Sequence, residues 1–356
     1  MKIGIVTQPL CNNYGGLLQN YALQQVLKRL GHEPKTIDFV ERITFTRYLL
    51  STCKQLLISV LKCRRPRIRR YVAIPRFRNP IMADFVHSHI DRTRIVHLYT
   101  KEIITEERFD AVITGSDQVW RPIYNSYIED MFLKFVPDSI KKIAYAASFG
   151  VDTWEYNDIK TETCAKYAKR LDVISVREAT GVELCKTHLG VNAEHVLDPT
   201  ILAGTDAYKP LLKGKKGPDY LFAYILDMTP EKKDYVKSMA KQKGLEARIH
   251  GADKEAILSV EDWLSMIANA SMVITDSFHG TVFSILFHRD FLSIVNQERG
   301  GTRFSSLLNP LELDNCMGDI SQLQSLELSP IYWKQVDICL DKQRKDSMNF
   351  LTDALK

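Results

Sequence analysis

The last third of the chain contains a short apolar strand pattern that passes directly into an apolar helix pattern. Residues 272–275 are apolar or β-branched, and residues 281–287 are apolar around most of a helix, so both need cover. The turn between them carries Asp276, Ser277 and His279. Such a turn exposes backbone N–H groups at the positive end of the helix dipole, which suits a phosphate or carboxylate. On local sequence alone we favour the simpler interpretation, in which Asp276 or Ser277 caps the helix and His279 is a hydrogen-bonded turn residue.

Similar apolar strand patterns alternate with helical patterns along most of the chain. The predicted strands are residues 2–7, 34–40, 110–114, 142–147, 172–176, 194–197, 220–226, 245–250, 272–275 and 291–295. Strands this apolar, separated by helices, predict parallel sheets that are covered on both faces. The predicted fold class is therefore α/β, with two Rossmann-like domains that face each other across a cleft.

One segment separates the two runs of strands. Residues 204–218 hold three glycines and two prolines among polar residues, which is typical of a linker. A chain of 356 residues is also long enough for two domains. We predict an N-terminal domain over residues 1–205, a C-terminal domain over residues 206–330, and a helix over residues 331–356 that packs back on the first domain. Residues 43–80 are predicted to form a basic helical insertion in the first domain.

The positive charge of the chain is concentrated in this insertion. Residues 62–78 contain eight basic residues and no acidic one, so the formal net charge of +5 comes entirely from this segment. We favour a solvated basic helix. The alternative is a surface that holds the protein against anionic lipid, where each cation contributes about 1 kcal/mol. Only Tyr71 and Phe77 are available for stacking on bases, so we do not expect nucleic acid as a partner.

The cysteines and the N-terminus predict a cytoplasmic protein. The seven cysteines are scattered without a Cys-x-x-Cys pair, which favours free thiols over a zinc or iron–sulfur site. The pair His87 and His89 is a weak metal signal, and we expect no metal. No apolar run is long enough to cross a bilayer, and the N-terminus enters a strand pattern without a signal peptide.

A polar segment follows the first predicted strand. It contains Asn12, Asn13, Tyr14, Gly15 and Gly16, but it lacks the third glycine of the dinucleotide-binding pattern G-x-G-x-x-G. We predict a loop in which the backbone approaches a ligand closely, at the carboxyl end of a strand where α/β sheets bind ligands.

Two later strands also end in polar residues. Ser116, Asp117 and Gln118 follow the strand at 110–114, and Arg177 follows the strand at 172–176. An arginine at a strand end can hold a carboxylate or phosphate in a bidentate manner. We therefore expect these residues to contribute to a ligand site.

Six motifs occur in order over nearly the whole chain. They are NYGGLLQNYALQ at 13–24, GSDQVW at 115–120, AYAASFG at 144–150, SVRE at 175–178, LDPT at 197–200 and TDSFHG at 275–280. Together they resemble the polysaccharide pyruvyl transferase family. The resemblance implies a fold similar to the two-domain GT-B glycosyltransferases, and transfer of pyruvate from phosphoenolpyruvate to a sugar as a ketal. None of the family's motifs is found within residues 43–80.

The resemblance also implies functional roles for Arg177 and His279. We predict that His279 is the proton donor and that Arg177, Ser277 and Gly280 bind phosphoenolpyruvate. A second cation is expected from Arg299 or Arg303, and the sequence leaves both open.

The acceptor sugar is predicted to bind the first domain. The candidate residues are Asn12, Asn13, Tyr14, Gly15, Ser116 and Gln118. Asp117 is the candidate base for the sugar hydroxyl.

Two other functions remain as alternatives. One is a GT-B-type glycosyltransferase that uses a nucleotide sugar, and the other is a non-catalytic subunit of a polysaccharide-assembly complex. For the favoured function we expect a surface polysaccharide or its lipid-linked precursor as the acceptor, and action in the cytoplasm or peripherally at the inner face of the cell membrane. We predict no particular oligomeric state.

Overall fold

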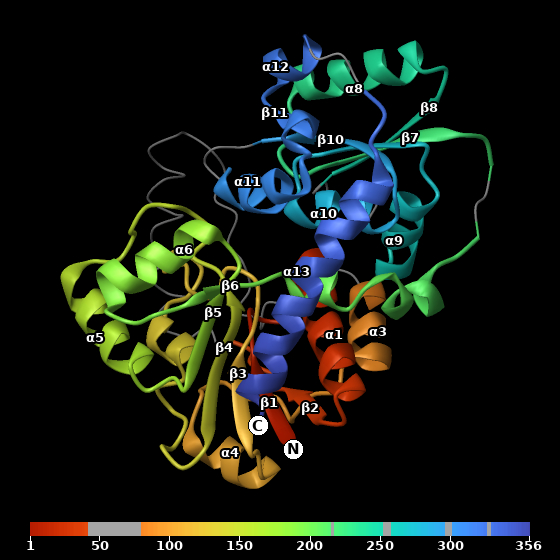
Figure 1. Ribbon diagram of the computed structural model, residues 1–356. Coiled ribbons are helices and arrows are strands. Elements are labelled where there is room, and N and C mark those ends of the chain that lie inside the picture. Colours follow the sequence, from red (N-terminus) through yellow and green to blue (C-terminus); the bar gives the residue numbers. More distant parts are fainter. Residues whose placement is uncertain (42–79, 215–216, 252–257, 296–300, 326–328) are drawn as a thin grey trace, which may run out of the picture.

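The computed structural model describes residues 1–41, 80–214, 217–251, 258–295, 301–325 and 329–356. These residues form two α/β domains, each built on one sheet, and a long C-terminal helix that runs along both (Figure 1). Of the basic insertion predicted over residues 43–80, only Pro80 lies within the described ranges, where it begins a helix. The basic segment at residues 62–78 lies outside them.

The first domain contains a six-stranded parallel sheet in the order β2-β1-β3-β4-β5-β6. The strands are β1 Lys2–Val6, β2 Glu33–Thr36, β3 Ala111–Thr114, β4 Lys141–Ala147, β5 Val173–Val176 and β6 Glu194–His195. The helices are α1 Tyr14–Arg29, α3 Pro80–His89, α4 Lys101–Glu107, α5 Asp158–Ala168, α6 Ala179–Leu184 and α7 Pro199–Leu202, with short turns η1 Ile128–Phe132, η2 Cys185–Leu189, η3 Thr205–Ala207 and η4 Lys209–Leu211. All four residues of β3 are buried, as its apolar and β-branched composition predicts.

The second domain contains a five-stranded parallel sheet in the order β11-β10-β9-β7-β8. The strands are β7 Tyr220–Ile225, β8 Glu246–Gly251, β9 Met272–Thr275, β10 Asp290–Ile294 and β11 Met317–Gly318. The helices are α8 Pro230–Gln242, α9 Val260–Ala268, α10 Phe278–Leu286, α11 Thr302–Leu308 and α12 Ile320–Gln324, with short turns η6 Asn309–Leu311 and η7 Asp314–Cys316. The two sheets confirm the predicted class of two Rossmann-like domains.

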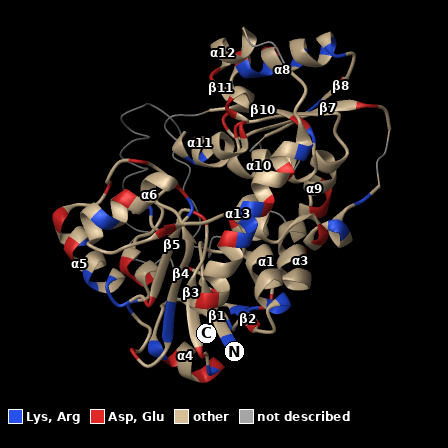
Figure 2. Cartoon of the chain, viewed as in Figure 1, with Lys and Arg blue, Asp and Glu red and all other residues tan. Residues whose placement is uncertain are grey.

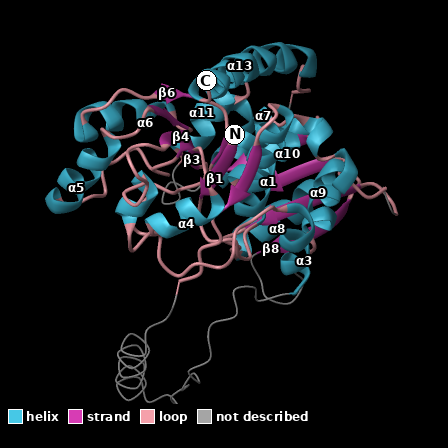
Figure 3. Ribbon diagram, turned by 90° about the horizontal axis from the view of Figure 1, so that it is seen from below, coloured by secondary structure: helices cyan, strands magenta, loops and turns pink. Residues whose placement is uncertain are grey.

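The C-terminal helix, α13 Trp333–Ala354, contacts both domains along the outside of the molecule (Figures 1 and 3). Near its start, Asp337 accepts a hydrogen bond from His288 of the second domain at 2.9 Å. Near its end, the backbone N–H of Leu197 donates to Ser347 Oγ at 3.0 Å, and Arg344 donates to the Ile201 carbonyl at 3.1 Å. The predicted return of the C-terminal helix to the first domain is therefore confirmed.

One continuous hydrophobic core joins the two domains. It includes α1 and α7 of the first domain and α10 of the second, which contact one another. The ring of Tyr14 stacks on Trp263 at a centroid distance of 5.0 Å, and its hydroxyl donates to the Leu258 carbonyl at 2.8 Å. Charged residues lie mainly on the outer helices and at the strand ends, and the strands β3, β5, β7 and β9 carry none (Figure 2).

Most predicted element boundaries differ from the observed ones by no more than one or two residues, and three differ by more. The predicted strand 34–40 is shorter, because β2 ends at Thr36 and Phe39 forms only an isolated bridge with Val96. The predicted loop after β1 is partly helical, because α1 begins at Tyr14 and Asn13 is its N-cap. The helix predicted at 281–287 begins three residues earlier, at Phe278. At both helix starts tertiary packing overrides the loop preference of glycine and polar residues.

None of the helices in the described ranges is long and apolar enough to span a membrane. Five cysteines fall in these ranges, and all five are free thiols: Cys11, Cys164, Cys185, Cys316 and Cys339.

Candidate functional site

Arg177 directly follows β5 and lies in a buried group of charged and polar residues. Its guanidinium donates to Asp198 Oδ2 at 3.0 Å, to Ser148 Oγ at 3.0 Å and to Glu178 Oε1 at 3.4 Å. The Ser148 hydroxyl donates to the same Glu178 carboxylate. Burial opposes the charge of Arg177, but the carboxylates of Glu178 and Asp198 outweigh it and raise the pKa above its ordinary value. We call Arg177, Glu178, Asp198, Ser116 and Ser148 the Arg177 cluster.

Asp198 connects this cluster to several strand ends. It is the N-cap of α7, and its carboxylate accepts hydrogen bonds from the Thr200 backbone N–H at 2.9 Å and hydroxyl at 2.6 Å. Ser116, which follows β3, donates its hydroxyl to Asp198 Oδ2 at 2.7 Å. Burial alone would raise the pKa of Asp198. The charges of His279, when it is protonated, and of Arg177 act with these hydrogen-bond donors to hold the pKa at about 2. Asp198 was not predicted as a site residue, although it lies in the motif LDPT.

His279 lies in the first turn of α10, which Ser277 caps by accepting a hydrogen bond from the Gly280 backbone N–H at 3.4 Å. Its Nε2 is 3.8 Å from Asp198 Oδ2 and has no hydrogen-bond partner within the described part of the chain. Burial lowers the pKa of His279, and the nearby Arg177 charge adds to this, while Asp198 opposes it. The imidazole is therefore neutral at neutral pH in this state.

The start of α1 packs directly on His279. A Cβ atom at Gly15 would lie 2.0 Å from His279 Nδ1, so no side chain fits there without displacing the ring. Because Gly15 is in the first turn of α1, the positive ends of α1 and α10 both lie beside the imidazole. This contact joins a residue of the first domain to one of the second. It places Gly15, predicted to bind the acceptor, against the candidate proton donor.

Arg303 brings a second guanidinium to the site. It lies in α11, is buried, and approaches the Phe278 ring at 5.9 Å, while Arg177 approaches the same ring at 4.7 Å. Burial, together with the charge of Arg177, lowers the pKa of Arg303 to about 10, although Glu178 and Asp117 oppose the shift. Arg299, the other predicted cation, lies outside the described residues. We call His279, Arg303 and Phe278 the second-domain group.

Asp117 follows Ser116 with a left-handed backbone, φ 78°. Non-glycine residues rarely adopt this conformation, and where they do it often marks a functional position. The carboxylate accepts a hydrogen bond from the Gln118 backbone N–H at 2.9 Å and acts electrostatically on both His279 and Arg303. The structure therefore brings the predicted base near the predicted proton donor, His279, and near Arg303, which was predicted to bind phosphoenolpyruvate.

The other predicted acceptor residues lie around the start of α1 and the end of β3. Asn13 caps α1 by accepting from the Gly16 backbone N–H at 3.2 Å. The Asn12 Oδ1 atom is buried and has no hydrogen-bond partner among the residues that the structure describes. Gln118 accepts from Arg121 Nη1 at 3.3 Å. The aromatic packing of Tyr14 against Trp263 gives Tyr14 a role in joining the domains as well.

Asp276, the alternative cap of α10, instead holds the loop that follows β7. Its carboxylate accepts from the backbone N–H groups of Leu226 at 2.6 Å and Asp227 at 3.1 Å, and from Lys232 Nζ at 2.8 Å. The prediction that Asp276 or Ser277 caps α10 is therefore confirmed for Ser277. The prediction that His279 is a hydrogen-bonded turn residue is wrong for Nε2, because this ring nitrogen faces Asp198 without a hydrogen bond.

Two guanidinium groups, two helix N-termini and a neutral imidazole converge at the carboxyl ends of β3, β5 and β9. This arrangement suits an anionic ligand, because the guanidinium groups and the helix N-termini present positive charge and N–H donors. Across the described ranges, no three His, Cys, Asp or Glu side chains are grouped as a metal site.

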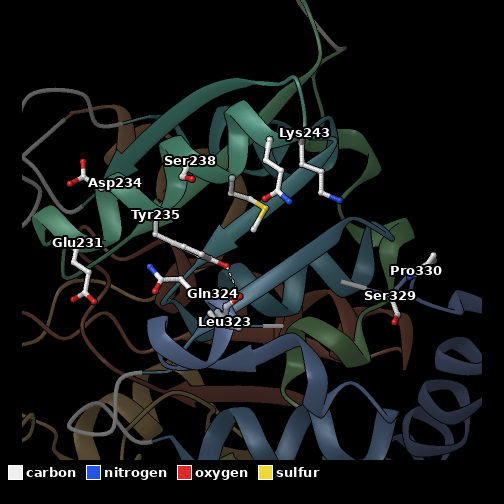
Figure 4. A pocket seen from close by; sticks show the side chains of 11 residues that line it. Glu231, Asp234, Tyr235, Ser238, Lys243, Leu323, Gln324, Ser329 and Pro330 are labelled. Carbon is white, nitrogen blue, oxygen red and sulfur yellow. Dashed lines mark hydrogen bonds between the residues drawn. The ribbon is translucent and has the colours of Figure 1, made fainter. Parts of the chain in front are cut away.

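A separate pocket lies in the second domain, away from these residues. It has a volume of about 860 Å³ and is lined by α8 and by the end of α12, including Tyr235, whose hydroxyl donates to the Leu323 carbonyl at 3.3 Å (Figure 4). None of the predicted site residues lines this pocket. The described ones among them lie instead around the carboxyl ends of β3, β5 and β9, the start of α1 and α11.

The chain matches the model of one family, described as polysaccharide pyruvyl transferase, over residues 13–298. No curated protein sequence matches it significantly. Among solved structures it is similar to a UDP-GlcNAc 2-epimerase from Methanocaldococcus jannaschii, with a TM-score of 0.51 and 9% identity over 96% of this chain and 92% of that one. It is also similar to a putative UDP-N-acetylglucosamine 2-epimerase from Listeria monocytogenes, with a TM-score of 0.47 and 12% identity over 98% and 90%. The first of these likenesses shows the fold alone, which is the predicted GT-B-like arrangement.

Proposed function

Because the chain belongs to the polysaccharide pyruvyl transferase family, we propose that it transfers pyruvate from phosphoenolpyruvate to two hydroxyl groups of a sugar. The product is a pyruvate ketal, and phosphate is released. The acceptor is a surface polysaccharide, such as an exopolysaccharide or capsule, or its lipid-linked precursor. The observation that carries this proposal is the approach of two buried guanidinium groups to one phenylalanine ring beside His279.

The donor would bind between the Arg177 cluster and the second-domain group. Phosphoenolpyruvate carries a phosphate and a carboxylate on one carbon, so it needs two sets of positive groups. Arg303 offers a charge that its surroundings disfavour, as its lowered pKa indicates, and an anion would stabilise this charge. Ser277 and the backbone N–H groups at the start of α10 supply further donors near the same position.

His279 would become the proton donor only when the donor substrate is bound. In the state described here burial lowers its pKa, but a bound anion would raise it because the anion favours the imidazolium. The imidazolium would then give its proton to the methylene carbon of phosphoenolpyruvate, which becomes the methyl group of the ketal. Asp198, 3.8 Å from Nε2, would help to stabilise the imidazolium.

The sugar hydroxyl groups complete the reaction at the central carbon. The first hydroxyl forms a bond to this carbon, and Asp117 accepts its proton. The bond between the central carbon and the phosphate oxygen then breaks, and the second hydroxyl bonds to the same carbon as it loses its proton. One of the two hydroxyl protons restores His279 and the other leaves with phosphate or solvent, so no oxidant or metal is required.

We place the reaction in the cytoplasm, on a precursor assembled at the inner face of the cell membrane. The basic segment at residues 62–78, outside the described residues, is the candidate for contact with that surface.

Thermal unfolding with different ligands tests the donor. A ligand that binds only the folded state adds about 2.7 kcal/mol at a hundredfold excess over its dissociation constant. We expect stabilisation by phosphoenolpyruvate and none by uridine, guanosine or cytidine diphosphates. The shift should be lost in Arg177→Lys, which keeps the charge without the guanidinium fork, and kept in the exposed control Arg94→Lys. Stabilisation by one nucleotide alone would instead support the glycosyltransferase, and none by any ligand would support a non-catalytic subunit.

A further inference from the structure

A second, smaller pocket lies at the carboxyl end of the first sheet. Its volume is about 60 Å³, and its lining includes Phe39, Tyr99, Tyr124 and Tyr127 together with the polar residues Thr7 and Asn125. Thr7 directly follows β1, and residues 124–127 belong to the connection between β3 and η1. We call this the aromatic pocket. None of the residues proposed above for donor or acceptor binding lines it.

The aromatic side chains of the pocket are of two kinds. Tyr124 and Tyr127 at its mouth are 52% and 54% exposed, which is unusual for neighbouring large aromatic residues. Tyr99 is buried and rigidly held, because it stacks between Phe39 at 4.8 Å and Phe135 at 5.0 Å. The pocket therefore combines a buried aromatic ring with two tyrosines that are about half exposed.

Buried polar atoms lie on the floor of the aromatic pocket. The Tyr99 hydroxyl is buried and has no hydrogen-bond partner in the described portion of the structure, although leaving such a group unsatisfied costs about 1–3 kcal/mol. Burial raises the pKa of Tyr99, so this hydroxyl keeps its proton and remains a donor. Asn125 is held in place because its amide donates to the Val119 carbonyl at 2.7 Å. A ligand with hydroxyl groups would satisfy the Tyr99 hydroxyl.

We propose that the aromatic pocket binds a pyranose ring of the saccharide acceptor. A pyranose presents C–H groups with partial positive charge on its faces, which suit the negative face of an aromatic ring, and hydroxyl groups at its edge. The pocket is too small to enclose a whole ring. The sugar would therefore lie across Tyr124 and Tyr127, with one hydroxyl directed inward to Tyr99.

The position of Tyr124 connects the aromatic pocket to the candidate reaction site. The Arg121 guanidinium lies over the Tyr124 ring at 5.4 Å and also donates to Gln118, one of the predicted acceptor residues. The Tyr124 hydroxyl is near enough to Arg303 to affect the pKa of that guanidinium. A sugar in this pocket would thus extend toward Asp117 and the donor. This role as an acceptor subsite rests on the proposed function, whereas sugar binding itself does not.

Saturation-transfer NMR on the full chain tests the proposal without phosphoenolpyruvate. The probes are the methyl glycosides of glucose, galactose, mannose and N-acetylglucosamine, and methyl lactoside. We expect saturation transfer to at least one glycoside. The affinity for this glycoside should be weaker by about threefold or more in Tyr127→Ala and in Tyr124→Ala. Tyr127→Phe should retain binding, because it keeps the ring. Tyr332→Ala is the matched control, since Tyr332 is 70% exposed and lies at the start of α13.

The outcomes separate this proposal from the proposed function. If no glycoside shows transfer, or if the transfer survives both alanine variants, the sugar subsite is wrong. If the alanine variants instead abolish a concentration-dependent dimer, the exposed tyrosines form a protein interface and the proposal is again wrong. If a glycoside binds as expected but phosphoenolpyruvate does not stabilise the protein, the subsite stands and the pyruvyl transfer fails.

Discussion

The Arg177 cluster and the second-domain group differ in how their charges are compensated. Arg177 is buried with two carboxylates, and its pKa is raised. Arg303 is equally buried, but its pKa is lowered to about 10, and that of His279 is lowered too. The two groups approach the same Phe278 ring from different domains.

This difference indicates what each group contributes to stability and to ligand binding. A compensated buried charge stabilises the fold, because removal of one partner leaves the others buried and unpaired. An anion added beside a group whose pKa is lowered raises that pKa and stabilises the charged form of the group. We therefore assign fold stability mainly to the Arg177 cluster, which is also proposed to bind the ligand, and the change in protonation on binding mainly to the second-domain group.

The largest effect on stability is expected from Arg177→Ala. It leaves the buried carboxylates of Asp198 and Glu178 without their cation, so the free energy of unfolding should fall by about 3–5 kcal/mol. Urea denaturation would measure this. The control is Arg94→Ala, which breaks an ion pair with Glu106 in which both side chains are at least half exposed, and which should cost much less stability. Equal losses in both variants would show that the Arg177 cluster stabilises the fold no more than an exposed ion pair does.

His279→Gln should reduce turnover by at least about 100-fold while the fold remains stable, because it removes the proposed proton donor but no hydrogen bond that His279 makes within the described residues. Turnover is followed as phosphate release with an acceptor that the wild-type protein uses. The dissociation constant for phosphoenolpyruvate should change only a few-fold. Near-normal turnover would exclude His279 as the acid.

Arg303→Met should weaken phosphoenolpyruvate binding by roughly ten- to a hundredfold, because a charge-assisted contact worth about 1.5–3 kcal/mol is lost. Its free energy of unfolding should change by less than about 1 kcal/mol, because removal of a disfavoured buried charge offsets the lost contacts. A loss of stability as large as that of Arg177→Ala would show that Arg303 is equally structural.

The dependence of stability on pH should reveal the lowered pKa of His279. The unfolded chain binds a proton on this residue below pH of about 6.5, while the folded protein does not until the pH reaches its lower pKa. Stability should therefore fall as the pH falls through this window, and fall less in His279→Gln. Denaturation of both proteins at several pH values measures the difference. Parallel curves would contradict the assignment.

Tyr14→Phe should have the smallest effect, about 1 kcal/mol of stability, because it removes only the hydrogen bond to the Leu258 carbonyl and keeps the stack on Trp263. Thermal unfolding is sufficient to detect it. An effect on phosphoenolpyruvate binding would show that this contact between domains also sets the position of the second-domain group.

The fold class could be predicted from the sequence because apolar strands between helices predict parallel sheets. Polar residues at strand ends likewise predicted a ligand site that includes Arg177. The functional role predicted for His279 came from the resemblance to the family, because its local sequence favoured a hydrogen-bonded turn residue. The contact of Gly15 with His279 could not be predicted, since it joins residues far apart in the chain and depends on how the domains pack.

Asp198 was missed for a related reason. Its sequence neighbours show only a proline that ends a strand, whereas its role arises from Ser116, Arg177 and His279, which three different strands bring together. The start of α1 was mispredicted because Gly15 and Gly16 favour a loop locally, and only packing on the second domain makes the helix begin at Tyr14. An aspartate that precedes a proline after a strand is the signal that would have indicated Asp198.

The central claim is that binding of an anionic donor by the second-domain group makes His279 take up a proton from solvent. Titration calorimetry of phosphoenolpyruvate near neutral pH, in two buffers with different ionisation enthalpies, measures proton uptake on binding directly. We predict uptake of up to about one proton in the wild-type protein, and correspondingly less in His279→Gln, which still binds the ligand. Equal proton uptake in both proteins, or no binding of phosphoenolpyruvate, would contradict the account.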